Sequence, residues 1–130
     1  MIYQYDPNGI FEQNPAKGGV CTIKGSLGQP AAAAVDSNLV TAISGKVIRV
    51  VSVLAAGLTA ATTLTFNTNP AGAGAGVAIT PRFYVINTAN FILANNELGW
   101  FETTVSQGLT CTIGAGSAVD VQIRYIEVVP

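Results

Sequence analysis

The sequence holds few residues that could carry out chemistry, and histidine is absent from it. Without an imidazole, the chain cannot build a Ser–His or Cys–His nucleophile pair or a histidine metal site. Its two cysteines, Cys21 and Cys111, make no zinc site on their own. We expect both to be buried free thiols that are not bonded to each other, with a disulfide as the alternative. This expectation rests on residues 1–7, which lack the basic and apolar regions of a secretory signal and so favour the cytoplasm.

Two further patterns could serve a reaction, and each has a simpler interpretation. Glu97 and Glu102 are close enough in sequence for an acid/base pair, but they flank a turn, where solvated charges are expected. Gly72, Gly74 and Gly76 have a phosphate-loop spacing, yet the residues that follow run into a proline and cannot begin the required helix. We therefore expect no catalytic residue, metal site, cofactor or small-molecule ligand, and we do not expect an enzyme.

The composition indicates a chain whose surface is covered by partners. Hydrophobic residues make up 49% of the 130 positions and charged residues only 10%, with a net charge of −1. Typical soluble domains carry about 25% charged residues, so a chain this poor in charge is expected to hide apolar surface in an assembly. Nucleic acid is not expected as a ligand because the sequence holds no basic patch. A membrane span is not expected either, since the longest low-polarity run, residues 50–61, is too short.

Short apolar runs separated by turn residues predict an all-β protein. Residues 62–66 alternate between a face with Thr62, Leu64 and Phe66 and a face of threonines, which is typical of a half-buried strand. We expect an antiparallel β-sandwich or jelly roll of about seven to eight short strands. The sandwich domain is predicted to span residues 39–130, with strands at 39–43, 46–54, 59–67, 82–86, 90–93, 100–103, 109–113 and 118–129.

Two of these strands carry apolar residues on both faces, which predicts a second covered surface. With strict alternation, one face of the central strand holds Val47, Arg49, Val51 and Val53, and the other holds Lys46, Ile48, Val50, Ser52 and Leu54. Near the end of the last strand, apolar residues interrupt an otherwise polar outer face. The Trp-Phe pair that follows Gly99 caps the core or forms an exposed platform. The expected oligomer interface comprises Val47, Arg49, Val51, Trp100, Phe101, Arg124, Ile126 and Val128.

Residues 1–38 are expected to form an extended arm rather than part of the domain. Tyr3, Tyr5 and Phe11 stand among prolines and glycines that prevent a regular element. Three aromatic side chains need an apolar surface, so we expect them to bind a partner. Within the arm, residues 20–24 could form a short strand and residues 30–34 a helical turn.

Several segments together resemble small structural proteins from the head-gene regions of tailed bacteriophages. The segments are Gly45-Lys46-Val47-Ile48-Arg49-Val50, Leu54-Ala55-Ala56, residues 62–66, Gly99-Trp100-Phe101-Glu102-Thr103, Gly108-Leu109 and residues 121–128. The resemblance implies a capsid decoration (cement) protein, often trimeric, on the outer surface of the virion and assembled in the host cytoplasm. Its implied partners are the major capsid protein and further copies of itself. The alternative is a phage fibre-tip or receptor-binding β-domain that recognises host surface glycans.

Overall fold

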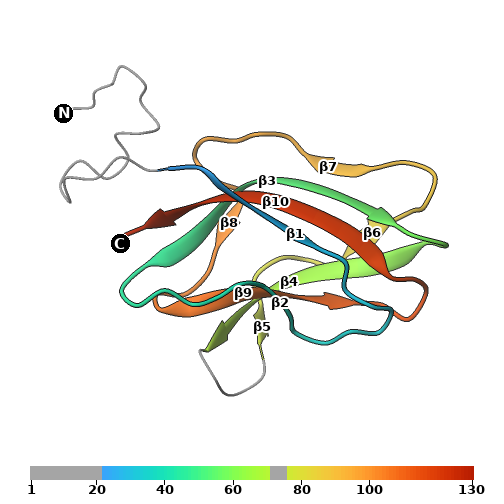
Figure 1. The fold of residues 1–130 in the computed structure, drawn as a ribbon, viewed down its shortest axis with the longest axis horizontal. Helices are drawn as coiled ribbons and strands as arrows, with labels where there is room; N and C mark the ends of the chain where they lie inside the picture. Colours follow the sequence, from blue (N-terminus) through green and yellow to red (C-terminus); the bar gives the residue numbers. More distant parts are fainter. Residues whose placement is uncertain (1–21, 71–75) are drawn as a thin grey trace.

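Two antiparallel sheets stack face to face in a computed structural model of the chain, which describes residues 22–70 and 76–130 (Figure 1). The first, here called the β3 sheet, has the strand order β1-β10-β3-β7, and β8 also pairs with β3. Its strands are β1 (Lys24–Gly28), β3 (Val47–Gly57), β7 (Phe91–Leu93), β8 (Phe101–Glu102) and β10 (Val119–Val128).

The second sheet, here called the β4 sheet, has the order β2-β9-β4-β5, and β6 also pairs with β4. Its strands are β2 (Ser37–Val40), β4 (Thr62–Pro70), β5 (Val77–Ala78), β6 (Phe83–Val85) and β9 (Gln107–Ile113). No helix occurs in the described ranges. The predicted all-β class is confirmed, and the two antiparallel sheets are consistent with the predicted β-sandwich. Ten strands are described where about seven to eight were expected, because short strands such as β5 add to those that the sequence indicated.

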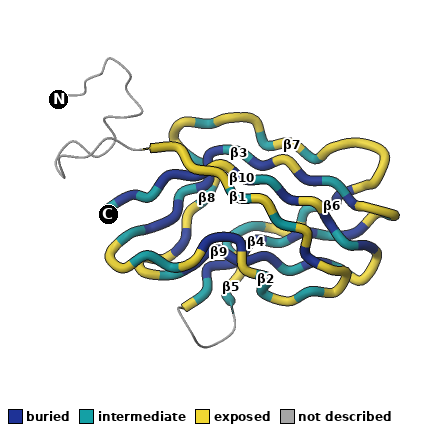
Figure 2. Tube along the Cα trace, viewed as in Figure 1, coloured by how far each residue is buried: buried dark blue, intermediate teal, exposed yellow. Residues whose placement is uncertain are grey.

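Apolar side chains from both sheets fill the space between the layers. In Figure 2, the buried residues are the dark blue parts of the Cα trace, and they occur on strands of both sheets. Phe66 of β4 lies at its centre, with its ring centroid 4.9 Å from that of Phe101 in the opposite sheet. A second ring pair, Phe83 and Phe91, joins β6 to β7 at 4.8 Å. The alternation along β4 creates this core because every second residue points inward.

Part of the expected arm belongs to the sandwich. Lys24–Gly28 pairs with β10 along its whole length, and Ser37–Val40 pairs with β9. Backbone hydrogen bonds to an existing edge hold β1 despite its two glycines, and Ser26 Oγ donates to the Leu39 carbonyl at 2.8 Å. Among the described residues, the sheet structure thus begins at Lys24 rather than near residue 39. Residues 31–34 form a turn, with Ala34 N donating to Ala31 O, instead of a helical turn.

A β-bulge divides the central strand. Arg124 of β10 pairs with Ser52, whereas the next residue, Tyr125, pairs with Val50, so Val51 has no partner opposite it. An extra residue on one strand of an antiparallel pair shifts the alternation by one position. The faces predicted by strict alternation are therefore wrong beyond the bulge. The core receives Ile48, Val50, Val53 and Ala55 from β3, and the outer face receives the remaining side chains.

Candidate interaction surface

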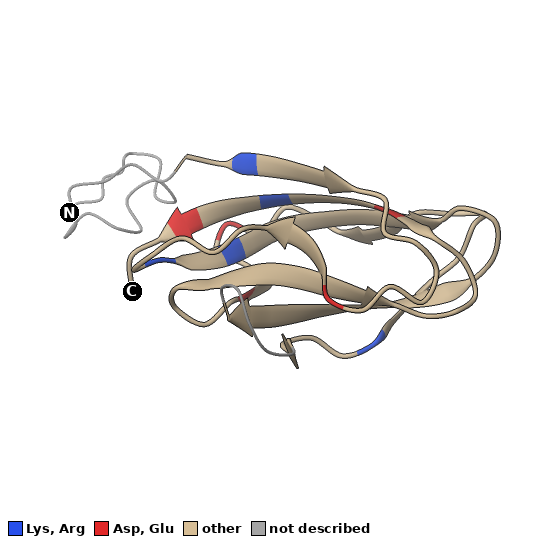
Figure 3. Cartoon of the chain, turned by 60° about the horizontal axis from the view of Figure 1, so that its bottom comes forward, with Lys and Arg blue, Asp and Glu red and all other residues tan. Residues whose placement is uncertain are grey.

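The outer face of the β3 sheet, the face turned away from the β4 sheet, carries the features that suggest a partner. Residues directly opposite each other in an antiparallel pair share a face. The register therefore places Val128 beside Val47, Ile126 beside Arg49, and Gln122 beside Leu54 on this surface. Charges are sparse on the two sheets, as Figure 3 shows, so most residues of this face are uncharged polar or apolar.

One end of the outer face holds a second buried cluster, separate from the main core. This group, here called the outer-face cluster, consists of Val47, Val51, Ile126 and Val128, and both Val51 and Ile126 are fully buried. Val51 lies on the same side as Val47 and Ile126, and the bulge adds the next residue, Ser52, to that side. Four residues of the expected interface are thus brought together, and they are already covered within the chain.

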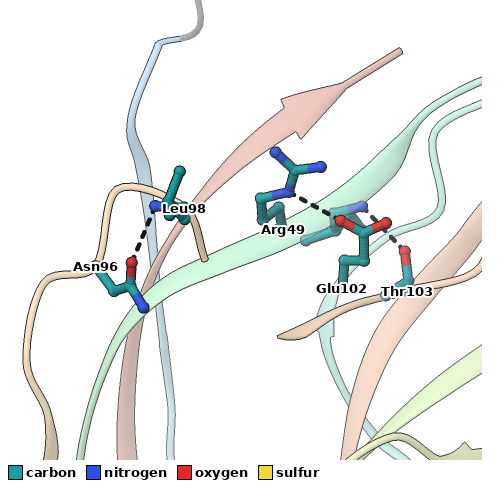
Figure 4. Close-up of polar contacts among 6 residues, drawn as sticks. Arg49, Asn96, Leu98, Glu102 and Thr103 are labelled. Atoms are coloured by element: carbon teal, nitrogen blue, oxygen red, sulfur yellow. Dashed lines mark hydrogen bonds and ion pairs between the residues drawn. The ribbon is translucent and has the colours of Figure 1, made fainter. Parts of the chain in front are cut away.

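Arg49 lies on the same face and is fixed by neighbours within the chain. Its Nε donates to Glu102 Oε1 at 2.8 Å, as Figure 4 shows, and the two residues are opposite each other in the β3–β8 pair. Gly99 packs against the side chain, and a Cβ added there would come within 2.4 Å of Arg49 Cγ. Gly99 also has a φ of 87°, a left-handed conformation that glycine adopts without strain.

The two aromatic residues after Gly99 point to different environments. Phe101 contacts Phe66 in the main core, so it lies outside the outer-face cluster. Trp100 is 45% exposed, and its indole Nε1 donates to the Ala94 carbonyl at 2.7 Å. The interpretation as a core cap therefore fits Phe101, and the interpretation as an exposed platform fits Trp100.

Beyond the bulge, the outer face carries a row of three exposed apolar side chains and one glutamine. Leu27 of β1 pairs with Gln122 of β10, Gln122 pairs with Leu54 of β3, and Leu54 pairs with Ile92 of β7. These four residues, here called the outer row, lie at one level on β1, β10, β3 and β7. Leu27 is 78% exposed and Ile92 61%. Neighbouring exposed apolar side chains are a common feature of binding surfaces, so the outer row is a candidate interaction surface.

Two hollows flank the outer row. The larger, of about 610 Å³, is lined by Leu27, Leu54 and Gln122 together with neighbours that include Asn90 and Asp120. The smaller, of about 430 Å³, lies between Leu54 and Ile92 and also borders Ser52, Asn95 and Arg124. The row therefore forms a ridge between two shallow depressions, each large enough for an aromatic side chain.

Arg124 is the one cation at the edge of the smaller hollow. It is exposed, and its neighbours on the adjacent strands, Gly25 and Ser52, are too small to cover it. Within residues 22–70 and 76–130, the ion pairs join Lys24 and Lys46 to Glu127 and Arg49 to Glu102, and none involves Arg124. Its guanidinium is thus available for a carboxylate of a partner.

Sequence reasoning located one half of this surface and missed the other. The interface residues expected on β3 and β10 do lie on one face, but Leu27, Leu54 and Ile92 were not among them. Leu27 falls in a segment in which apolar and polar residues do not alternate. Strict alternation along the central strand predicts that Leu54 shares the face of Ile48. Only the bulge reveals that Leu54 faces outward, and it has no sequence signature. Tyr3, Tyr5 and Phe11 lie outside the described residues.

A polar cluster on the β4 sheet is the main alternative site, and its contacts show a structural role. Asp36 Oδ1 accepts from Asn67 Nδ2 at 2.9 Å and from Thr110 Oγ1 at 3.1 Å, and Oδ2 accepts from Gly76 N at 2.9 Å. These hydrogen bonds hold the pKa of Asp36 below its ordinary value, and the bond from Gly76 N contributes most to the lowering. Because both oxygens are occupied, the carboxylate fixes Gly76 against β4 and β9 and is not available to a ligand.

Cys111 is a buried free thiol in the main core. Burial raises its pKa to about 12, and the charge of Asp36 adds to the rise. A thiol with such a pKa remains protonated near neutral pH and is a poor nucleophile or metal ligand. Its expected partner in the alternative disulfide, Cys21, lies outside the described residues.

Neither a metal site, a membrane-spanning helix nor a related protein gives a further assignment for the described residues. Among the described residues, no group of three or more histidine, cysteine or carboxylate side chains could hold a metal ion. No helix in those residues is long and apolar enough to cross a membrane. No protein-family model matches the chain, and no curated protein matches it significantly.

Proposed function

We propose that this chain is a bacteriophage capsid decoration (cement) protein. In this proposal it binds the outer surface of the virion head, as a homotrimer, and stabilises contacts between subunits of the major capsid protein. The observation that carries the proposal is the outer row, an exposed apolar ridge on the flat face of a charge-poor sandwich. Apolar surface of this kind needs a stable protein partner, whereas a catalytic site needs titratable groups in a cleft.

The resemblance of several segments to phage head proteins gives this surface its partner. Those segments include the strand around Val47–Arg49, the Gly99–Thr103 turn and the last strand, and they build the outer face or its rim. A repeated shell offers many equivalent sites, so a modest contact made by every copy yields a large total stabilisation. The assignment explains the low charge, because much of the surface would be covered after assembly.

Purified protein mixed with undecorated phage heads provides the test. We expect saturable binding at a fixed ratio to capsid subunits and a higher temperature of head disruption, both read by sedimentation and scanning calorimetry. The variant Leu54→Asp should bind at least tenfold more weakly, because it places a charge on the ridge. Arg82→Glu, an exposed change on the opposite side of the sandwich, is the matched control. Unaltered binding by Leu54→Asp would contradict the proposed surface.

A second candidate function is a fibre-tip domain that recognises host glycans, and the exposed indole of Trp100 favours it. Aromatic faces stack on sugar rings, and this indole is held in place by its bond to the Ala94 carbonyl. Binding to host cells that is lost in Trp100→Ala, without binding to heads, would select this function over the first.

A further inference from the structure

We propose that the smaller hollow beside the outer row binds the N-terminal arm of a second copy of this chain, with Phe11 in the hollow and Glu12 on Arg124. This inference rests on the proposed function, in which copies lie next to one another. It adds a second contact to the one with the head: the arm occupies the hollow on the Ile92 side of the outer row and leaves the larger hollow, on the Leu27 side, to the major capsid protein. Residues 1–21 precede the described part of the chain and contain three aromatic residues.

The chemistry of the hollow matches an aromatic residue followed by an acid. Leu54 and Ile92 supply apolar walls, and Arg124 at the rim makes no ion pair with any described residue. In the arm, Phe11 is followed by Glu12, so one dipeptide offers a ring for the walls and a carboxylate for the guanidinium. Arginine binds carboxylates through two parallel hydrogen bonds, which favours this pairing over a contact with a lone aromatic.

Phe11 fits this position better than either tyrosine of the arm. A phenyl ring carries no hydroxyl that would need a hydrogen-bond partner when buried between leucine and isoleucine. Tyr3 is followed by glutamine and cannot supply the carboxylate. Tyr5 is followed by Asp6, but it lies six residues farther from β1 than Phe11 does, which lengthens the segment to be ordered.

The direction of β1 favours the arm of a neighbouring copy over the chain's own arm. β1 runs from Lys24 to Gly28, and the outer row crosses it at Leu27, so the preceding residues join the strand at the end away from the row. A chain's own arm would have to reverse to reach the row.

The length of the arm is sufficient for exchange between copies. The segment from Phe11 to Thr22 can extend over about 36 Å. A domain of this size has a radius of gyration of about 14 Å. A compact body with this radius of gyration is about 36 Å across. The extended segment is therefore about as long as the domain is wide, which lets Phe11 of one copy reach the outer face of a copy in direct contact with it.

Disulfide trapping between two preparations tests the proposal without any phage shell. Both carry the full chain with Cys21→Ser and Cys111→Ala; one adds Gln13→Cys beside Glu12, and the other adds Asn95→Cys at the hollow. After mixing and mild oxidation, we expect a mixed disulfide dimer on a non-reducing gel. The matched control replaces Asn95→Cys with Arg82→Cys, on the opposite side of the sandwich, and should yield at least tenfold less dimer.

Two further variants check the side chains that make the contact. Phe11→Ala and Arg124→Glu, each in the trapping background, should lower the dimer yield at least tenfold. Combining Glu12→Arg on the arm with Arg124→Glu on the partner should restore most of it, because the ion pair is remade with reversed charges. A general loss of folding would not be rescued in this way.

The alternatives give different outcomes. If a single chain carrying both Gln13→Cys and Asn95→Cys closes on itself, and the mixture yields no dimer, the arm binds its own sheet and the proposal is overturned. If neither preparation is trapped, the smaller hollow is not an arm site, and the proposal is overturned as well. Head binding is measured separately, so the decoration function can stand when the arm contact fails.

Discussion

Val51 and Ser52 are consecutive residues of β3, yet both side chains lie on the outer face of its sheet. Val51 joins Val47 and Ile126 in the outer-face cluster, whereas Ser52 pairs with Arg124 and borders the smaller hollow. Two neighbours on one side are possible only where the alternation is interrupted, as at this bulge. The bulge thus separates a covered end of the face from an exposed end.

Our first prediction concerns the covered end. Ile126→Ala should lower the free energy of unfolding by about 2–5 kcal/mol, because Ile126 is fully buried and its loss leaves a cavity. Arg124→Ala, two residues away on the same face, should change it by less than about 0.5 kcal/mol, since it is exposed and unpaired among the described residues. Urea unfolding measures both values. Equal effects of the two substitutions would show that the cluster is not packed as described.

The sequence predicted most strands but could not predict how their faces are used. β4 and most of β10 show clean alternation, and the structure confirms which side faces the core. β1 reads Lys-Gly-Ser-Leu-Gly and shows no such pattern, so its position depends on backbone pairing with β10. The bulge depends on a register set between two distant strands. For that reason, the apolar character of both faces was visible in the sequence while the exposed row was not.

A second prediction concerns the ring contact between the sheets. Phe101→Ala should lower the free energy of unfolding by about 3 kcal/mol. This value is near the lower end of the range for Phe→Ala substitutions in protein cores, because the side chain of Phe101 is only partly buried. Its ring packs at 4.9 Å from Phe66, so the loss also removes an aromatic contact. Tyr84→Ala, at a position 76% exposed, serves as the control and should have little effect. Comparable midpoints in urea for both variants would contradict this assignment.

A third prediction is a pH dependence that arises from Asp36. Its pKa is lower in the folded protein than the ordinary value of 3.8, so the unfolded chain binds the proton more tightly. The stabilisation is therefore complete above that ordinary value and is lost as the pH falls through the lower folded value. Asp36→Asn keeps a residue that tolerates the positive φ of 51° and should cost about 1–2 kcal/mol at pH 7.

The pH series itself provides the check on Asp36. Urea unfolding of both proteins between pH 7 and pH 2 should show the difference between them shrinking as the wild-type carboxylate becomes protonated. A difference that stays constant across this range would show that the charge of Asp36 does not contribute.

Our fourth prediction concerns the thiols. Cys111 is buried with its pKa raised to about 12, so it should not react with a thiol reagent at pH 8 while the protein is folded. After unfolding without reductant, the chain should take up two labels, one on Cys21 and one on Cys111, as intact mass spectrometry will show. An unfolded chain with no label would mean that the two cysteines are bonded to each other.

The last prediction separates the arm from the domain. Deleting residues 1–19 leaves every described strand intact, because β1 begins only at Lys24 and pairs with β10 through its own backbone. We expect the truncated protein to fold with a nearly unchanged melting temperature. Three aromatic residues are lost, and each contributes about 1.5–3 kcal/mol when fully buried against a partner, reduced by the cost of ordering the segment.

Binding to heads should therefore fall sharply in the truncated protein, beyond the loss expected for one contact, because each copy on the shell loses the same interaction. Sedimentation with undecorated heads measures the loss, and circular dichroism confirms that the β-domain is retained. A full-length variant with Tyr3, Tyr5 and Phe11 all changed to Ser is the matched control for chain length and should behave like the truncation. Tight binding by the truncated protein would instead assign the shell contact to the sandwich face alone.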